Sequence, residues 1–254
     1  MRVPFETVDG RIYVQATVDG HGPFRFAVDT GASGVGRADS SLVAALGLPL
    51  GRVEGNSDGV NTAQVDTTTF ASLDVGGLVR NDVVVPTRDY RGRMAPEAAF
   101  SGIVAREFFA DGLLVIDYPR KLLSFSRKRS LAPGQGGALG YERPFRIPVA
   151  IGNVRAEGNL DTGADVAFVL PRALFDRVGG TPLEAAGRGQ LANTRVETQR
   201  STVAGPFRIG QAVLRDVEVR VSDRYPELLV GAQALQQSVV LIDQRSKAVA
   251  VCGE

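Results

Sequence analysis

The sequence of 254 residues contains one cysteine, one histidine and no tryptophan. Cys252 has no second cysteine with which to form a disulfide, and a single cysteine cannot make a cysteine-based zinc site. His21 alone cannot build a histidine-rich metal centre, and it can serve at most one Ser-His or Cys-His site. We therefore expect no metal and no cofactor, and a hydrolase of this composition would depend on carboxylates.

The sequence also lacks a large excess of charge of one sign, and it lacks long hydrophobic runs. The 29 basic and 28 acidic residues leave a net charge of +1, which argues against a nucleic-acid partner because such proteins usually carry a basic excess. The lysines never follow glycine, so there is no Gly-Lys-Ser/Thr phosphate loop. No apolar run approaches the ~18 residues of a membrane-spanning helix. Residues 1–7 lack the apolar core of a secretory leader, so we expect either a cytoplasmic protein or one whose leader has already been removed, and the composition does not decide between them.

What the sequence does contain is an internal repeat. Three segments of the first half recur in the same order in the second half. The pairs are 29–32 with 161–164 (Asp-Thr-Gly-Ala in both), 75–85 with 209–219, and 114–118 with 240–244. A chance tetrapeptide would not bring two further matched segments with it, so we interpret the chain as a duplication.

An uncharged stretch separates the two copies. Residues 131–140 (LAPGQGGALG) hold four glycines and one proline, which is typical of a linker. The predicted domains are an N-terminal lobe over 1–130, this linker, and a C-terminal lobe over 141–254, each lobe with one Asp-Thr-Gly loop.

Strand signals dominate both lobes. Apolar and β-branched residues alternate over 11–18 and recur over 146–151, and Asp-Gly and Gly-Gly pairs mark turns between such runs. Only short helices are indicated, one capped near Asp39 and one with Pro171 at its first position. The predicted fold class is mainly β, in two β-rich lobes related by a pseudo-twofold axis, with short helices.

The two Asp-Thr-Gly-Ala motifs indicate a site between the lobes. Asp29 and Asp161 each follow a strand-like run, so each lies where a strand ends and a loop begins. Equivalent loops of a duplicated protein can meet across the pseudo-twofold axis, which would bring the two carboxylates face to face. Such carboxylates share a proton. The ionised one can take a proton from a water molecule while the protonated one donates to a carbonyl oxygen, which is general acid–base catalysis of amide hydrolysis.

The neighbouring residues fit this interpretation in pairs. The threonine hydroxyls could bond across the axis, the glycines allow close approach of their amides to a carboxylate, and the alanines are small enough for a crowded junction. The pairs are Thr30 with Thr162, Gly31 with Gly163, and Ala32 with Ala164. An isolated Asp-Thr-Gly is more often an ordinary turn, but two matched copies favour the dyad. A second matched pair, Asp117 and Asp243, is interpreted as turn or cap residues.

The motifs resemble those of aspartic peptidases, and the retropepsin-like branch more closely than the pepsins. Residues 161–165 (Asp-Thr-Gly-Ala-Asp) have the form of the retroviral protease motif, and residues 29–33 (Asp-Thr-Gly-Ala-Ser) are similar to it. Each half also carries two apolar residues and a small one, as this family does before a short helix. These are Leu229-Val230-Gly231 and Ile103-Val104-Ala105, where Ala replaces Gly.

The resemblance implies a single-chain aspartic endopeptidase with the bilobal acid-protease fold, a cleft between the lobes and a flap over it. It implies interlocking threonines, substrate-backbone contacts from Ser33 and Asp165, a peptide or protein substrate, and a monomer. It also implies a periplasmic or secreted enzyme whose leader has been removed.

Two glycine-containing segments are candidates for flaps that bind substrate. The first is 53–65 with Gly55, Asp58 and Gly59 at a tip, and the second is 187–196 with Gly189 and Asn193. For the second, an ordinary surface hairpin remains an equal alternative.

At the level of function, a non-catalytic peptide-binding module on the same fold remains the main alternative. A carboxylate-pair glycosidase would need neither twin Asp-Thr-Gly loops nor a duplicated chain.

Overall fold

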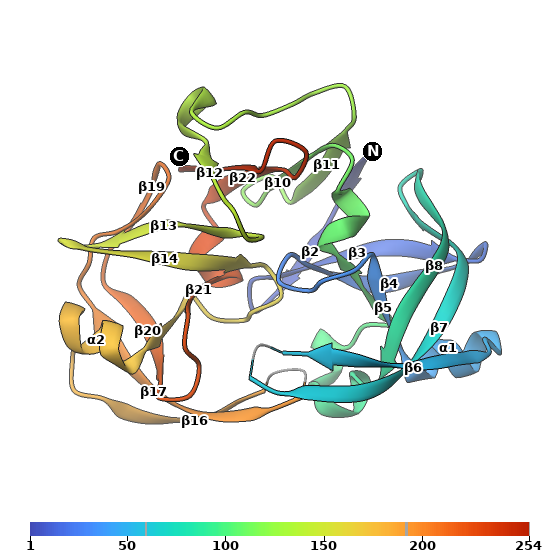
Figure 1. The fold of residues 1–254 in the computed structure, drawn as a ribbon, viewed down its shortest axis with the longest axis horizontal. Helices are drawn as coiled ribbons and strands as arrows, with labels where there is room; N and C mark the ends of the chain where they lie inside the picture. Colours follow the sequence, from blue (N-terminus) through green and yellow to red (C-terminus); the bar gives the residue numbers. More distant parts are fainter. Residues whose placement is uncertain (59, 191–192, 254) are drawn as a thin grey trace.

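The computed structural model describes residues 1–58, 60–190 and 193–253. Two β-rich lobes lie side by side, and a third sheet lies along one edge of both, at the top of Figure 1. This arrangement confirms the predicted mainly β, two-lobed fold. Within the described residues, no helix has the length and hydrophobicity to cross a membrane.

The N-terminal lobe is built on an eight-stranded sheet. In spatial order its strands are β2 (Glu6–Val8), β3 (Arg11–Val18), β4 (His21–Asp29), β9 (Gly102–Ala105), β5 (Gly36–Asp39), β8 (Leu78–Arg88), β7 (Thr62–Val75) and β6 (Leu50–Ser57).

The C-terminal lobe is built on a nine-stranded sheet. In spatial order its strands are β19 (Ala212–Leu214), β18 (Phe207–Ile209), β13 (Arg146–Ile151), β14 (Val154–Asp161), β21 (Leu228–Gly231), β15 (Phe168–Pro171), β20 (Val217–Ser222), β17 (Arg195–Val203) and β16 (Glu184–Gln190).

The duplication seen in the sequence is repeated in the strand pairing. The order β3-β4-β9-β5-β8-β7-β6 corresponds to β13-β14-β21-β15-β20-β17-β16. In both lobes the aspartate strand is parallel to the strand of the apolar triplet, through β4–β9 and β14–β21. The hairpins β6–β7 and β16–β17 are therefore equivalent elements, as are the two aspartate loops.

The third sheet takes strands from both halves of the chain. Its order is β1 (Arg2–Pro4), β11 (Leu122–Ser126), β10 (Leu113–Asp117), β22 (Ser238–Asp243), β23 (Ala248–Gly253) and β12 (Leu139–Gly140). β10 and β22 pair antiparallel, with Ile116 opposite Val240, so the repeated segments 114–118 and 240–244 lie directly against each other. The division at 131–140 stays a proposal, because β12 belongs to this shared sheet.

Two helices of seven residues complete the lobes. α1 (Ser40–Leu46) is capped as predicted, since Asp39 Oδ1 accepts a hydrogen bond from the Ser41 amide at 2.9 Å, and it ends at Gly47 with φ 62°. α2 (Arg172–Val178) begins one residue later than predicted, with Pro171 in the cap position. Short 3-10 helices occupy Arg91–Arg93, Pro96–Ala98, Arg106–Phe109, Gln135–Gly137 and Ala232–Leu235.

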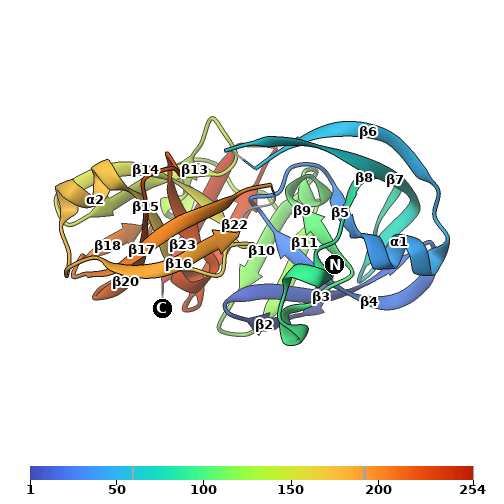
Figure 2. The same cartoon turned by 90° about the horizontal axis from the view of Figure 1, so that it is seen from below.

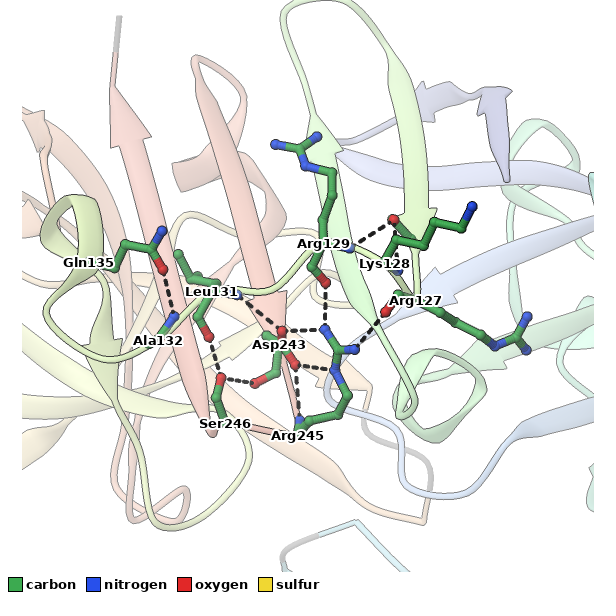
Figure 3. A network of polar contacts seen from close by, with 10 residues as sticks. Arg127, Lys128, Arg129, Leu131, Ala132, Gln135, Asp243, Arg245 and Ser246 are labelled. Carbon is green, nitrogen blue, oxygen red and sulfur yellow. Dashed lines mark hydrogen bonds and ion pairs between the residues drawn. The ribbon is translucent and has the colours of Figure 1, made fainter.

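The turn between β22 and β23 holds the segment that enters the predicted linker (Figure 3). Asp243 is fully buried and its Oδ2 accepts from the Leu131 amide at 3.1 Å and from Arg245 Nη2 at 2.6 Å. Arg245 also donates to the carbonyls of Arg127, at 3.0 Å, and Arg129, at 2.6 Å. Burial acts to raise the pKa of Asp243, but the guanidinium and backbone donors outweigh it and lower that pKa.

The pair Asp117 and Asp243 therefore has turn roles, as the sequence indicated. Asp117 accepts from the amide of Arg120 at 3.0 Å and pairs with its guanidinium at 2.9 Å.

Candidate functional site

The two aspartate loops meet where the lobes adjoin. β4 ends at Asp29, opposite Ala105 of β9, and β14 ends at Asp161, opposite Gly231 of β21. Both aspartates therefore occupy the same position in equivalent pairs of parallel strands, at the last residue before each loop.

The threonines lock the two loops together. The Thr30 amide donates to Thr162 Oγ1 at 3.1 Å, and the Thr162 amide donates to Thr30 Oγ1 at 3.0 Å. Each hydroxyl in turn donates to a backbone carbonyl of the other lobe, Thr30 to Leu160 at 3.2 Å and Thr162 to Val28 at 2.8 Å. Both threonines are buried. Because the amide and the hydroxyl of each threonine have partners, the loops are held in one fixed arrangement.

The glycines leave space for the opposite carboxylate. A Cβ added to Gly31 would lie 2.5 Å from Asp161 Cγ, and a Cβ added to Gly163 would overlap Asp29 Cγ. Any side chain at either position would displace the facing aspartate. Because Gly31 lies against Asp161 and Gly163 lies against Asp29, the two carboxylates lie close together.

Backbone amides orient the carboxylates within their own loops. Asp29 Oδ1 accepts from the Ala32 amide at 2.9 Å, and Asp161 Oδ1 accepts from the Gly163 amide at 2.8 Å. Burial, followed by the negative charge of Asp29, raises the pKa of Asp161 well above its ordinary value. The pair therefore holds a proton at a pH where an isolated aspartate would have lost it.

Replacing glycine by alanine in the first apolar triplet leaves the local backbone pattern unchanged. Three successive amides beginning at Ala105 bond to the loop after Asp29, and three beginning at Gly231 bond to the loop after Asp161. The bonds are Ala105 to Val35, Arg106 to Ala32 and Glu107 to Gly34 in the first lobe, and Gly231 to Ala167, Ala232 to Ala164 and Gln233 to Val166 in the second. Both candidate loops are therefore supported in the same way.

The two predicted flap segments meet at their tips, at the bottom of Figure 1 and near the middle of Figure 2. The Asn193 amide donates to Asp58 Oδ2 at 2.7 Å, and Asn193 Nδ2 donates to the carbonyls of Asn56, at 2.6 Å, and Asn61, at 2.9 Å. Asn61 Nδ2 donates to Thr194 Oγ1 at 2.9 Å. The segment 187–196 thus makes a specific contact with the other hairpin.

Asp58 is the ionised member of this contact. Burial acts to raise its pKa, but donors from Asn61, Val60, Asn193 and Thr194 outweigh burial and lower it. The sequence placed Asp58 and Asn193 in the candidate flap segments, as Asn and Asp are typical of hairpin tips, but it did not predict that the two residues bond to each other.

The predicted substrate-binding residues are distributed over these loops and hairpins. Ser33 and Asp165 are exposed beside the aspartate loops, and Asp165 Oδ2 lies 3.7 Å from Arg11 Nη2. Gly55 lies in β6 and Gly189 in β16, while Gly59 lies outside the described residues.

Two tyrosines beside the aspartates were also missed. Burial raises the pKa of both. At Tyr90 the charges of Arg37 and Arg88 oppose this rise and the charge of Asp29 adds to it, and at Tyr225 the charge of Asp161 adds to it. The signal that could have found them is their position, just after the equivalent strands β8 and β20.

The carboxylates of the site are not part of a metal-binding cluster in the described residues. Across residues 1–58, 60–190 and 193–253, no three His, Cys, Asp or Glu side chains gather as ligands for an ion. The arrangement offers two facing carboxylates and a fixed backbone, which suits proton transfer to and from a bound water molecule.

The comparisons with known proteins agree with this site. Residues 14–105 and 147–239 each match the protein family described as Aspartyl protease, and together the matches span more than half of the chain. Each matched segment contains one Asp-Thr-Gly loop and one apolar triplet. No curated protein matches the chain at a significant level. The resemblance inferred from the motifs is confirmed.

Proposed function

The chain belongs to the aspartyl protease family, and from this premise we propose that it is an aspartic endopeptidase whose catalytic residues are Asp29 and Asp161. One observation carries the proposal most directly: Gly31 and Gly163 each lack the Cβ that would displace the facing aspartate. This space allows the two carboxylates to lie together and work as a pair.

The raised pKa of Asp161 supports a dyad that holds one shared proton. In this proposal Asp161 carries that proton at the start of the reaction. Asp29 takes a proton from a water molecule between the carboxylates, and the water oxygen attacks the peptide carbonyl carbon. Asp161 gives its proton to the carbonyl oxygen, which forms a tetrahedral diol. When the C–N bond breaks, the proton on Asp29 passes to the leaving nitrogen and the diol returns one proton to Asp161.

The substrate lies between the dyad and the hairpins in this proposal. Asp165 and Ser33, which follow the Asp-Thr-Gly-Ala motifs, bind the substrate backbone, and Gly55 and Gly189 belong to the hairpins that cover it. Both aspartate loops come from one chain, which supports a monomer as the active form, with a peptide or protein as its only partner.

The test is cleavage of a peptide library from pH 3 to 8 by the wild type and by Asp29→Asn. The expected result is cleavage by the wild type and a loss of about 10²-fold or more in the variant, with unchanged melting behaviour. Full activity in Asp29→Asn would remove the dyad from the mechanism.

The alternative is a non-catalytic peptide-binding module. Retention of both Asp-Thr-Gly-Ala motifs speaks against it, because binding alone needs no facing carboxylates. It predicts that wild type and Asp29→Asn bind library peptides equally and that neither cleaves them at any pH.

A further inference from the structure

The face of each lobe that carries the aspartate differs in chemistry between the two copies. Side chains alternate along a strand, so the residue two positions before each aspartate shares its face. On that face the directly paired residues are Tyr13, Ala27 and Ile103 in the N-terminal lobe, and Arg146, Asn159 and Leu229 in the C-terminal lobe. The duplication makes these two sets position-by-position counterparts.

The N-terminal face is apolar and aromatic. Its buried residues form a cluster separate from the main core, made of Tyr13, Ala27, Ala32, Phe100, Ile103 and Ala105. Tyr90 packs against Phe100 with ring centroids 5.4 Å apart, and Met94 also packs against this cluster. Ala32 belongs to the aspartate loop itself, so the cluster lies directly beside Asp29.

The C-terminal face is polar and charged. Asn159 Nδ2 donates to Glu227 Oε2, and Glu227 Oε1 lies 3.5 Å from Arg143 Nη2 and 3.9 Å from Arg146 Nη1. These ion pairs are long, and the Arg143 side chain is 66% exposed. Long, exposed pairs contribute little, so the carboxylate is free to exchange a solvated arginine for another donor.

Tyr225 relates this polar group to the catalytic centre. Burial raises the pKa of Tyr225 to about 12, with further contributions from the charges of Asp161, Glu227 and Asp58. The position of Glu227 follows from geometry: Asn159 pairs with Leu229, and its side-chain amide donates to Glu227. Glu227 therefore adjoins the face that carries Asp161, beside the space that the proposed function assigns to the substrate.

We propose that Glu227, oriented by Asn159, is a specificity-determining residue that selects a hydrogen-bond-donating cationic side chain on the C-terminal-lobe side of the scissile bond. This inference rests on the proposed endopeptidase function. It predicts an asymmetric substrate, with a preference for lysine or arginine on one side of the cleaved bond only.

The experiment compares cleavage of peptides that differ only by lysine against norleucine, which has a similar chain without the charge, at each position flanking the cleaved bond. The wild type is expected to prefer lysine on one side only. Glu227→Gln keeps the shape and is expected to reduce that preference, measured as a ratio of kcat/KM values, by about tenfold, because a charged hydrogen bond is lost.

Glu157→Gln is the matched control. Glu157 also pairs with Arg146, at 2.9 Å, but it lies two residues further from Asp161 along the strand than Asn159 does. We therefore expect the lysine preference of Glu157→Gln to stay within about twofold of that of the wild type. Melting curves establish that each variant is folded.

The outcomes separate the two claims. Wild-type cleavage with no lysine preference, an unchanged preference in Glu227→Gln, or an equal loss in Glu157→Gln overturns the assignment of Glu227 and leaves the endopeptidase standing. No wild-type cleavage of any peptide overturns the proposed function and this inference with it. If Glu227→Gln does not fold, the wild-type preference alone decides.

Discussion

At the scale of single residues, two glycines determine whether the aspartates can meet. Their backbone conformation is not the reason, because neither has a positive φ. What matters is the missing Cβ, whose place is taken by the carboxylate of the other lobe. The rule that glycine permits close approach was enough to predict from the sequence that these glycines lie close to a carboxylate. It could not predict that each glycine faces the aspartate of the opposite motif, because that depends on how the lobes adjoin.

Gly163→Ala tests this directly. The new methyl group displaces Asp29, and a misplacement of about 1 Å at a catalytic group costs about 10²-fold in rate. We expect kcat for peptide cleavage to fall by about that factor. Gly140→Ala is the matched control, since a Cβ there has nothing closer than 3.7 Å. Equal activity in the two variants would show that Asp29 does not need its present position.

Asp161→Asn tests the raised pKa through stability. An aspartate whose pKa is raised in the folded state favours folding fully below its unfolded pKa of about 3.9, and that contribution is lost as pH rises through the folded pKa. The neutral amide avoids this loss. We expect the Tm of Asp161→Asn to exceed that of the wild type by about 2 °C or more at pH 8, and the two values to converge at pH 3. A constant difference across this range would contradict the raised pKa.

At the scale of elements, contacts between segments far apart in the chain complete the site. The hairpins β6–β7 and β16–β17 could be predicted as glycine-containing hairpins, because turn residues are a local signal. Their contact through Asn193 and Asp58 could not, because it joins residues 135 positions apart. The same holds for the turn after β22, where Asp243 and Arg245 hold a segment more than a hundred residues earlier.

Asn193→Ala tests the contact between the hairpins. The change removes the two bonds from Nδ2 to the carbonyls of Asn56 and Asn61 while the backbone bond to Asp58 remains. We expect KM for a library peptide to change severalfold, with kcat within about twofold, since the dyad is untouched. Thr198→Ala, within β17, removes a contact internal to one hairpin and should leave KM as it is. Identical KM values for both variants would contradict a role for the tips in binding.

Asp243→Asn tests the turn that holds the linker. Because the pKa of this carboxylate is lowered on folding, it contributes stability that is present above the unfolded pKa and lost as pH falls through the folded pKa. We expect the variant to melt several degrees below the wild type at pH 7, on the order of 5 °C, with the gap narrowing below about pH 4. Asp117→Asn, at the matched position of the repeat, should have a smaller effect. A larger effect at Asp117 would reverse the roles assigned to the pair.

At the scale of the whole molecule, the duplication explains both the fold and the site. The three repeated segments predicted two equivalent lobes, and the strand orders of the two sheets agree with that prediction. The shared six-stranded sheet was not predicted, because strand pairing between β10 and β22 leaves no local signal in either strand. Divergence between the copies is equally informative. Ala27 and Asn159 occupy the same position, yet one belongs to an apolar face and the other to a polar one.

The central claim is that the facing aspartates hydrolyse peptide bonds, and the most direct measurement is kcat/KM for one cleaved peptide in Asp161→Asn beside Asp117→Asn. Each variant loses one carboxylate from a repeated segment, 161–164 or 114–118, but only Asp161 is assigned to the dyad. The account predicts a loss of about 10²-fold or more for Asp161→Asn and activity within about twofold of the wild type for Asp117→Asn. Full activity in Asp161→Asn would contradict it.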